Sequence, residues 1–259
     1  MSTPAPDTAR ERRPRGRHRR RWSLESLLGL AVILAAAGLL VLERTEPEPR
    51  PHGPGERAAA AEPEAPPSEP PPFETPVLLR SVVDEVREGS GNLEVVEGEG
   101  EPVGDGVLRR YLVEVERGLP GDPEDFANAV EQILGDDDRG WPADDDVALQ
   151  RVDSGPVAFR VTLAAPNTTD ELCTPLRTGG FLSCSQDDRV VINQNRWVSG
   201  VEHFGGDLET YRTYVVNHEV GHALGHGHVN CTGRGDPAPV MQQQTFALNG
   251  CEPNGLPFP

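Results

Sequence analysis

Residues 207–228 read DLETYRTYVVNHEVGHALGHGH, and this stretch decides the fold around it. Asp207 is a good helix N-cap, because its side chain can accept a hydrogen bond from the first backbone N–H groups of a helix. Gly225 can adopt the left-handed conformation that ends a helix. A helix is therefore predicted from about Leu208 to Leu224, and the chain is expected to turn back beyond it.

The motif inside this helix carries the chemistry. His218 and His222 lie one turn apart on the same face, with Cβ atoms about 5 to 6 Å from each other. Their imidazoles can converge on one zinc ion at about 2.0 to 2.1 Å. Glu219 lies beside the first histidine, where it can reach a metal-bound water instead of the metal. The motif therefore predicts a Zn²⁺ site with Glu219 as the catalytic base.

A third ligand from this stretch requires the turn at Gly225. If the helix continued, His226 would lie about 12 Å along the axis from His218, too far to share an ion. Once the chain turns back, His226 and His228 both come within reach, and only one of them need bind. The residues alone leave this choice open.

The pattern H-E-x-x-H-x-x-G-x-x-H resembles the signature of the metzincin zinc metallopeptidases. The resemblance implies that His218, His222 and His228 bind zinc and that Glu219 is the catalytic residue. It also makes Met241, in the segment PAPVMQQQ, the candidate for the methionine turn that lies beneath the metal in this clan. A methionine that only fills a gap in the core is the alternative.

More narrowly, the chain resembles a little-characterised bacterial family of membrane-anchored proteins of metzincin type, classed as a domain of unknown function. Some metzincins use a tyrosine two residues after the turn methionine as an extra ligand, and Gln243 occupies that position here. No cysteine precedes the domain, so a cysteine-switch propeptide is not apparent. Residues 242–259 contain no recognisable specificity signal.

Outward from the motif, residues 77–259 are long enough for one self-sufficient core. A strand is expected at 108–116, where apolar residues alternate on one side, and a helix should follow with Asp122 as its N-cap. Further strands are expected at 147–152, 157–164, near Phe181 and at 189–193.

This order of elements, together with the resemblance, predicts an α/β fold of the α+β, zincin-like kind. A mixed twisted sheet should pack with two main helices, of which the second carries the zinc ligands. Glycine and proline dominate the sequence beyond that second helix, so an irregular C-terminal subdomain is expected.

All four cysteines of the chain lie in residues 77–259. Disulfides in an oxidising compartment are the expected use of such cysteines. The short separations favour the pairs Cys173 with Cys184 and Cys231 with Cys251. A cysteine-ligated zinc site is the alternative, but no spacing has the form C-x₂-C.

The N-terminal part predicts an anchored protein. Residues 27–42 read LLGLAVILAAAGLLVL, so a transmembrane helix is expected at 23–42, with a cleaved signal peptide or a buried core helix as alternatives. The arginine-rich residues 1–22 should form a cytoplasmic head, which makes 77–259 an extracytoplasmic domain of a single-pass cell-membrane protein. Residues 43–76, rich in proline and glutamate, are expected to form a disordered stalk.

The charge of the chain limits its partners. The formal net charge is −18 although the head is basic, and an acidic domain repels phosphate backbones, so no nucleic-acid partner is expected. The acidic runs Asp136–Asp138 and Asp144–Asp146 could bind calcium, but they lack the EF-hand pattern, and solvated turns are the preferred interpretation.

The leading hypothesis is a membrane-anchored, extracytoplasmic zinc-dependent endopeptidase that acts on peptide or protein substrates in the cell envelope or outside it. One rival is an inactive metzincin-like module that binds cell-envelope ligands and holds a structural zinc. Another is hydrolysis of a non-protein amide, such as one in a cell-wall peptide. Hydrolysis is favoured because a structural site has no need for Glu219 and usually closes all four metal positions with protein ligands.

Overall fold

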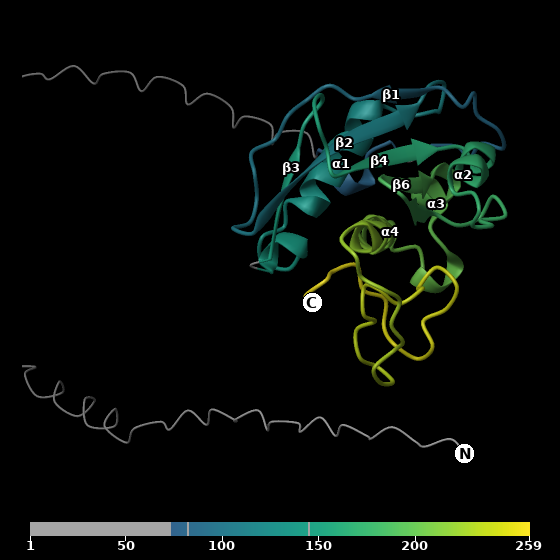
Figure 1. The fold of residues 1–259 in the computed structure, drawn as a ribbon. Coiled ribbons are helices and arrows are strands. Elements are labelled where there is room, and N and C mark those ends of the chain that lie inside the picture. The colour runs from purple at the N-terminus through teal and green to yellow at the C-terminus, as the bar shows by residue number, and fades with distance from the viewer. Residues whose placement is uncertain (1–73, 82, 145) are drawn as a thin grey trace, which may run out of the picture. The chain divides into compact units, whose positions relative to one another are not determined.

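A six-stranded mixed sheet forms the centre of the computed structural model, which describes residues 74–81, 83–144 and 146–259 (Figure 1). The parallel strands are β2 (Val107–Glu116), β3 (Val147–Arg151), β4 (Phe159–Ala164) and β6 (Arg189–Asn193). The antiparallel strands are β1 (Leu93–Val95) and β5 (Cys184–Gln186). The strand order is β1-β2-β4-β6-β5, with β3 also paired to β2, so β5 forms one edge of the sheet.

The long strand β2 organises the sheet. Tyr111 pairs with Arg151 of β3 and with Phe159 of β4, so those two strands lie on opposite sides of β2. Val115 pairs with Glu94 of β1 while it also pairs with β4 on its other side. β1 and β3 therefore share one side of β2, one beyond the other, and the sheet extends through β4 and β6 on the other side.

The first long helix, α1 (Pro123–Leu134), covers the apolar face of the sheet. The Asp122 side chain accepts a hydrogen bond from Glu124 N at 3.0 Å, and Pro123 occupies the first turn. These two residues set the start of the helix. The apolar side of the helix packs in one core with Tyr111, Val113 and Val115 of β2. Its buried residues are Phe126, Ala127, Ala129, Val130, Ile133 and Leu134.

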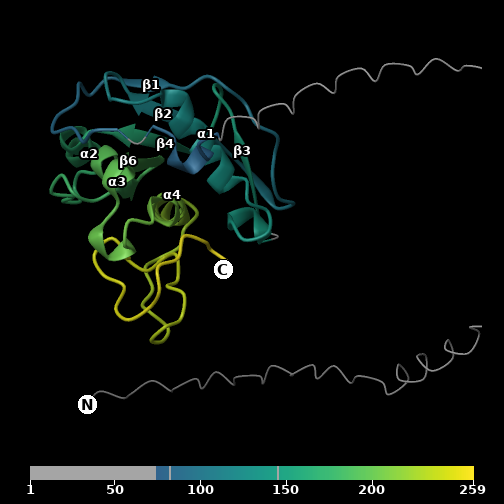
Figure 2. The same cartoon turned by 180° about the vertical axis from the view of Figure 1, so that it is seen from behind.

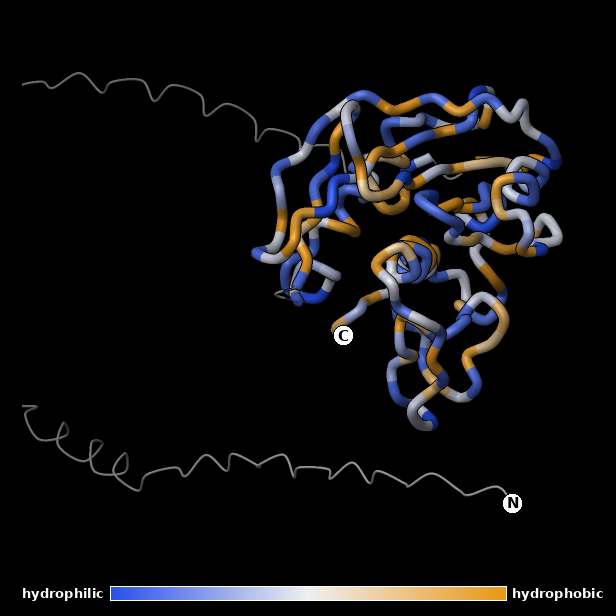
Figure 3. The backbone as a smooth tube through the Cα atoms, in the orientation of Figure 1, coloured by the Kyte–Doolittle hydropathy of each residue, from blue (hydrophilic) through white to orange (hydrophobic). Residues whose placement is uncertain are grey.

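The second long helix, α4 (Leu208–Ala223), lies between the sheet and the C-terminal loops, as both views show (Figure 1, Figure 2). Asp207 caps it, because its side chain accepts from Thr210 N at 3.0 Å. The middle of the helix, from Tyr214 to Gly221, is buried throughout. Hydrophobic residues mark the central strands, α1 and α4 in Figure 3. α4 therefore belongs to the core and has no wide polar face.

The expected mixed α/β fold is confirmed, with individual elements shifted. The strand expected near Phe181 is wrong: Phe181 lies in a turn, its ring is 4.4 Å from the guanidinium carbon of Arg196, and β5 begins at Cys184. Two short helices were not predicted, α2 (Pro166–Leu172) after β4 and α3 (Gln194–Ser199) after β6. No helix or strand follows α4 in residues 224–259, so the expectation of an irregular C-terminal part is confirmed.

Both expected disulfides are present. Cys173–Cys184 joins the end of α2 to the first residue of the edge strand β5. Cys231–Cys251 closes a loop in the C-terminal part. Because all four cysteines are paired, none is left to bind a metal.

The expectation of a transmembrane helix is corrected for the described part of the chain. Within residues 74–81, 83–144 and 146–259, no helix has the length and apolar character needed to cross a membrane. The segment 23–42, for which the membrane span was predicted, lies outside the described residues, as do the predicted head 1–22 and residues 43–73 of the predicted stalk.

Candidate metal centre

The end of α4 turns the chain back along the helix. Gly225 N–H donates to His222 O and His226 N–H donates to Gly221 O, both at 2.9 Å, which is the bonding pattern of a Schellman motif. Gly225 has a φ of 97°, a conformation that residues with side chains rarely adopt. The glycine therefore lets residues 226–228 return toward the helix face that carries the motif histidines.

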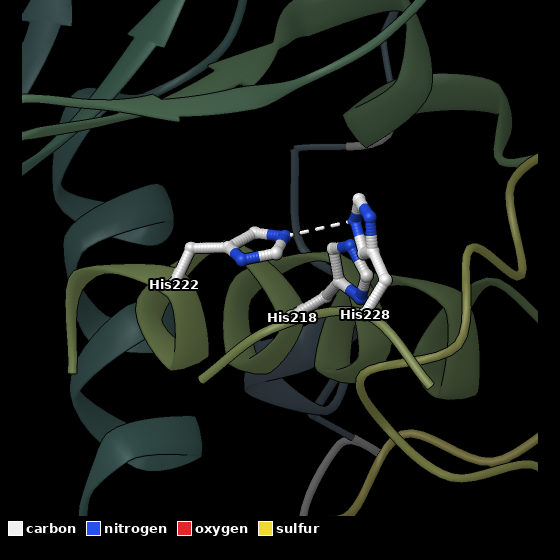
Figure 4. Close-up of side chains that lie close together, drawn as sticks. All are labelled: His218, His222 and His228. Atoms are coloured by element: carbon white, nitrogen blue, oxygen red, sulfur yellow. Dashed lines mark hydrogen bonds between the residues drawn. The ribbon is translucent and has the colours of Figure 1, made fainter. Parts of the chain in front are cut away.

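Three histidines meet at this point. His218 and His222 project from α4, and His228 projects from the returning segment, with their rings close together (Figure 4). One nitrogen from each ring lies within 4.8 Å of the other two, and Nε2 of His222 is 3.0 Å from Nε2 of His228. Ligand atoms of a tetrahedral zinc site lie about 3.3 Å apart, by geometry from bonds of about 2.0 to 2.1 Å. His226 is not part of the cluster and stacks on Trp141 instead.

Two backbone carbonyls orient the rings. His218 Nδ1 lies 2.8 Å from Val240 O, and His222 Nδ1 lies 2.9 Å from His226 O. Because a carbonyl oxygen only accepts hydrogen bonds, Nδ1 of each ring donates, and Nε2 of the neutral ring keeps its lone pair. Such outer hydrogen bonds are the usual way in which a protein fixes a metal-binding histidine. Both rings therefore turn Nε2 toward the cluster, where Nε2 of His222 contacts Nε2 of His228.

Burial lowers the pKa of two histidines of the cluster, His218 and His228. It lowers the pKa of His218 to about 3, with further lowering by His222 and His228 and an opposing effect of the hydrogen bond to Val240. Burial, together with the neighbouring His222, also lowers the pKa of His228 below its usual range. The neutral imidazole is the form that binds metals, so neither His218 nor His228 has to lose a proton near neutral pH.

Glu219 faces the same cavity without joining the histidine cluster. Its side chain is buried and lines the cavity together with the three histidines. No carboxylate of the described residues belongs to the group that could close on one ion. Burial raises the pKa of Glu219 to about 8. A nearby cation would favour the charged form, so this carboxylate is suited to accept a proton near neutral pH.

Val240 and Met241 support both arms of the cluster. Val240 O holds His218, and Met241 O accepts from Val229 N at 3.1 Å, one residue after His228. The Met241 side chain packs directly on α4, where a Cβ built on Gly221 would lie only 2.4 Å from its sulfur. Met241, the candidate for the methionine turn, thus packs against α4 next to the histidine cluster.

A cavity of about 370 Å³ opens over the three histidines and Glu219. One wall is the segment that leads into β5, and another is the segment after Met241. The remaining lining residues are Leu176, Arg177, Thr178, Leu182, Ser183, Cys184, Ser185, Tyr214, Gln243, Thr245 and Phe246. A second cavity of about 260 Å³ shares His228, Gln243 and Phe246 with the first and extends toward Val229 and Asn249. The two cavities therefore lie next to each other beside His228.

Several of these cleft residues were not anticipated. Tyr214 donates to Gln242 O and accepts from Thr245 N, both at 3.3 Å, and so fixes the cleft wall. Its position four residues before His218, on the same helix face, is the signal that could have found it. Arg177 and Phe246 had no such signal, because their place in the cleft depends on long-range folding.

The donor set fits zinc. Three imidazoles with converging nitrogens, beside a buried carboxylate that is outside the cluster, would leave a fourth position open to an ion, as in catalytic zinc sites. In the part of the chain that the structure describes, no other group of histidine, cysteine or carboxylate side chains could hold an ion. The first acidic run forms a turn instead, with Asp136 Oδ1 accepting from Asp138 N and Arg139 N.

Fold and site together describe a mixed α/β domain in which a buried helix and the segment after it bring three histidines together. The chain belongs to a family of proteins of unknown function, DUF3152, whose family model matches residues 81–256. The match includes every strand of the sheet, α4 and all three histidines. No curated protein matches the chain.

Proposed function

We propose that this domain is a zinc-dependent peptidase of metzincin type, with His218, His222 and His228 as the zinc ligands. The observation that carries the proposal is the convergence of the three histidines with the buried Glu219 in one cleft. A structural zinc site would have no use for an unpaired carboxyl group at this place, and it would close the fourth ligand position with protein.

The residues divide the reaction between them. Zinc supplies Lewis acidity when bound, which polarises the scissile carbonyl and lowers the pKa of water at the open position. Glu219 accepts the proton of the attacking water and passes it to the leaving amine, so the peptide bond is replaced by a carboxylate and a free amine. The cycle returns Glu219 to its starting charge, and no other reactant is required.

The cleft supports an extended peptide as the substrate. A second cavity shares His228, Gln243 and Phe246 with the first, so the surface next to His228 offers room for more of a peptide chain than the first cavity alone. Phe246 lies at the junction with 57 % of its surface exposed, and Leu176 is 51 % exposed at the other wall. Such apolar side chains at a cleft are suited to contact substrate side chains. Cleavage within a chain is thus favoured over removal of terminal residues.

The disulfides support action in an oxidising compartment. Cys173–Cys184 fixes the edge strand that borders the cleft, and Cys231–Cys251 fixes the segment that follows His228. Such bonds persist where thiols are not kept reduced. A peptide or protein substrate would be met in the same compartment.

The proposal is tested by Glu219→Gln in the full chain, assayed on a broad peptide library with zinc present. The amide keeps the size of the side chain but cannot accept the proton, so hydrolysis should fall by about 10² to 10⁴ while zinc content is unchanged. Glu209→Gln, the same change at an exposed position of α4, is the control and should retain full activity.

Equal cleavage by the wild type and Glu219→Gln would show that any activity arises elsewhere. If neither protein cleaves but both bind cell-envelope ligands with equal affinity, the alternative of an inactive binding module takes over.

A further inference from the structure

Trp141 links a remote loop to the motif helix. It begins η2 (Trp141–Ala143), after α1, and is buried. Its indole Nε1–H donates to Asn217 O of α4 at 3.0 Å, directly before the first histidine of the motif. Phe258, near the C-terminus, packs edge-on against the indole with ring centroids 6.4 Å apart. Two segments far apart in the sequence therefore meet at this ring, against α4.

The indole also contacts the helix at Gly221. A Cβ built on Gly221 would lie 2.7 Å from Cζ2 of Trp141 and 2.4 Å from the sulfur of Met241. Both distances are shorter than real Cβ contacts, so only glycine lets the two side chains approach the helix from either side. This places Trp141 against the turn of α4 that lies between His218 and His222.

His226 stacks on the same ring. The imidazole and the indole have centroids 4.5 Å apart and planes 18° apart. His226 is exposed, and its side chain contacts the rest of the described chain through this stack. Its backbone carbonyl accepts from His222 Nδ1 at 2.9 Å, so the position of His226 sets the orientation of a metal-binding ring.

The sequence around His226 makes this contact necessary. Gly225 and Gly227 flank it, and glycine loses more conformational freedom on ordering than any other residue. Backbone hydrogen bonds hold Gly225, His226 and Val229, but within the described residues none holds the N–H of Gly227 or His228 between them. A stacked aromatic pair supplies a restraint close to the point where the segment must pass the metal ligands.

We propose that Trp141 and His226 form a positioning pair, in which the stack of His226 on Trp141 holds the segment 225–228 so that His222 is correctly oriented and His228 reaches the metal. His226 then serves the site through its neighbours and is not a ligand. The inference rests on the zinc site of the proposed function, but not on hydrolysis.

The test is the zinc affinity of the full chain, measured by competition with a chromogenic chelator. His226→Ala should weaken zinc binding by about three- to tenfold, as expected from the strength of an aromatic pair, and should leave the stoichiometry unchanged. His226→Phe keeps a flat ring but no ligand atom, and it should restore most of the wild-type affinity. Asn230→Ala, another change in the exposed segment after α4, is the control and should have no effect.

Thermal unfolding of the metal-free proteins separates positioning from general stability. His226 is exposed and loses only the stack, so His226→Ala should lower the Tm of the metal-free protein by at most about 4 °C, the shift that about 1 kcal/mol produces in a domain of this size. Wild-type affinity in His226→Ala would overturn the inference. Failure of His226→Phe to restore affinity would also overturn it, because the imidazole itself would then be needed.

The two proposals fail in distinguishable ways. Tight zinc binding without peptide hydrolysis would remove the proposed function and leave the positioning pair intact. A wild-type chain that binds no zinc would overturn both.

Discussion

Replacement of Gly221 by alanine places one methyl group where the support of the metal site is tightest. The new Cβ would lie 2.4 Å from the sulfur of Met241 and 2.7 Å from Cζ2 of Trp141. Met241 is flexible and can move aside, whereas Trp141 is fixed by its hydrogen bond to Asn217 O. The clash is therefore relieved mainly by displacing Met241, with some shift of α4 from the indole.

Two opposing effects set the size of the change. Alanine is favoured over glycine inside a helix by about 0.8 to 1.0 kcal/mol. Overpacking of a close-packed interior costs about 1 to 3 kcal/mol. Both contacts are much shorter than ordinary Cβ contacts, so we expect the cost of overpacking to be at the upper end of its range. Gly221→Ala should therefore lower the free energy of unfolding by about 1 to 2 kcal/mol. For a domain of this size, that corresponds to a decrease in Tm of about 2 to 8 °C.

Calorimetry of the metal-free full chain measures this decrease, and Gly227→Ala is the matched control. A Cβ at Gly227 meets nothing within 4 Å, so that variant should unfold with the wild type. An increase in Tm for Gly221→Ala would mean that helix propensity outweighs the contacts, and the close packing of Met241 and Trp141 on α4 would be refuted.

Two further changes test the cleft walls. Asp170 accepts from the Thr178 hydroxyl and from Gly180 N–H, which lowers the pKa of its carboxyl. A carboxyl group with a lowered pKa in the folded state stabilises the fold at higher pH, and this stabilisation is lost as the pH falls through the folded-state pKa. Asp170→Ala should therefore be less stable than the wild type at pH 6, by at most about 1 kcal/mol at this exposed site, and the difference should shrink as the pH falls through the lowered pKa of Asp170. Chemical denaturation at several pH values checks this, and a pH-independent difference would contradict it. Tyr214→Phe removes a buried hydroxyl from the wall behind His218 and should lower the unfolding free energy by about 1 to 2 kcal/mol in urea; an unchanged midpoint would show that this hydroxyl does not hold the wall.

The sequence predicted the elements that are long enough to show a hydrophobic pattern or that begin at a recognisable helix cap. Helix α1 has an apolar period, and both long helices have N-cap residues, Asp122 for α1 and Asp207 for α4. These helices and strand β6 lie close to where they were expected. The three-residue strand β1 and the short helices α2 and α3 have too few residues for a period to be visible. Phe181 suggested a strand, but its aromatic side chain is used in the contact with Arg196 instead.

The candidate site divides in the same way. His218, Glu219, His222 and Gly225 lie within one short motif, so local spacing was enough to predict that the two helix histidines share a face and that the chain turns back after them. The spacing alone did not choose between His226 and His228. His226 stacks on Trp141, which contacts α4 at Asn217 from 76 residues earlier in the sequence, and no local pattern marks such a long-range contact. Cleft residues such as Phe246 come from loops placed by long-range folding, and no local pattern marks them.

The central claim is that the three histidines hold a catalytic zinc, and elemental analysis of the purified, zinc-repleted full chain tests it most directly. The account predicts one zinc per chain in the wild type. His228→Ala, which removes one of three converging nitrogens, should lose most of this zinc, and Glu219→Gln should keep all of it. A folded wild type that retains less than about a tenth of an equivalent, or a His228→Ala variant that retains zinc as well as the wild type does, would contradict the account.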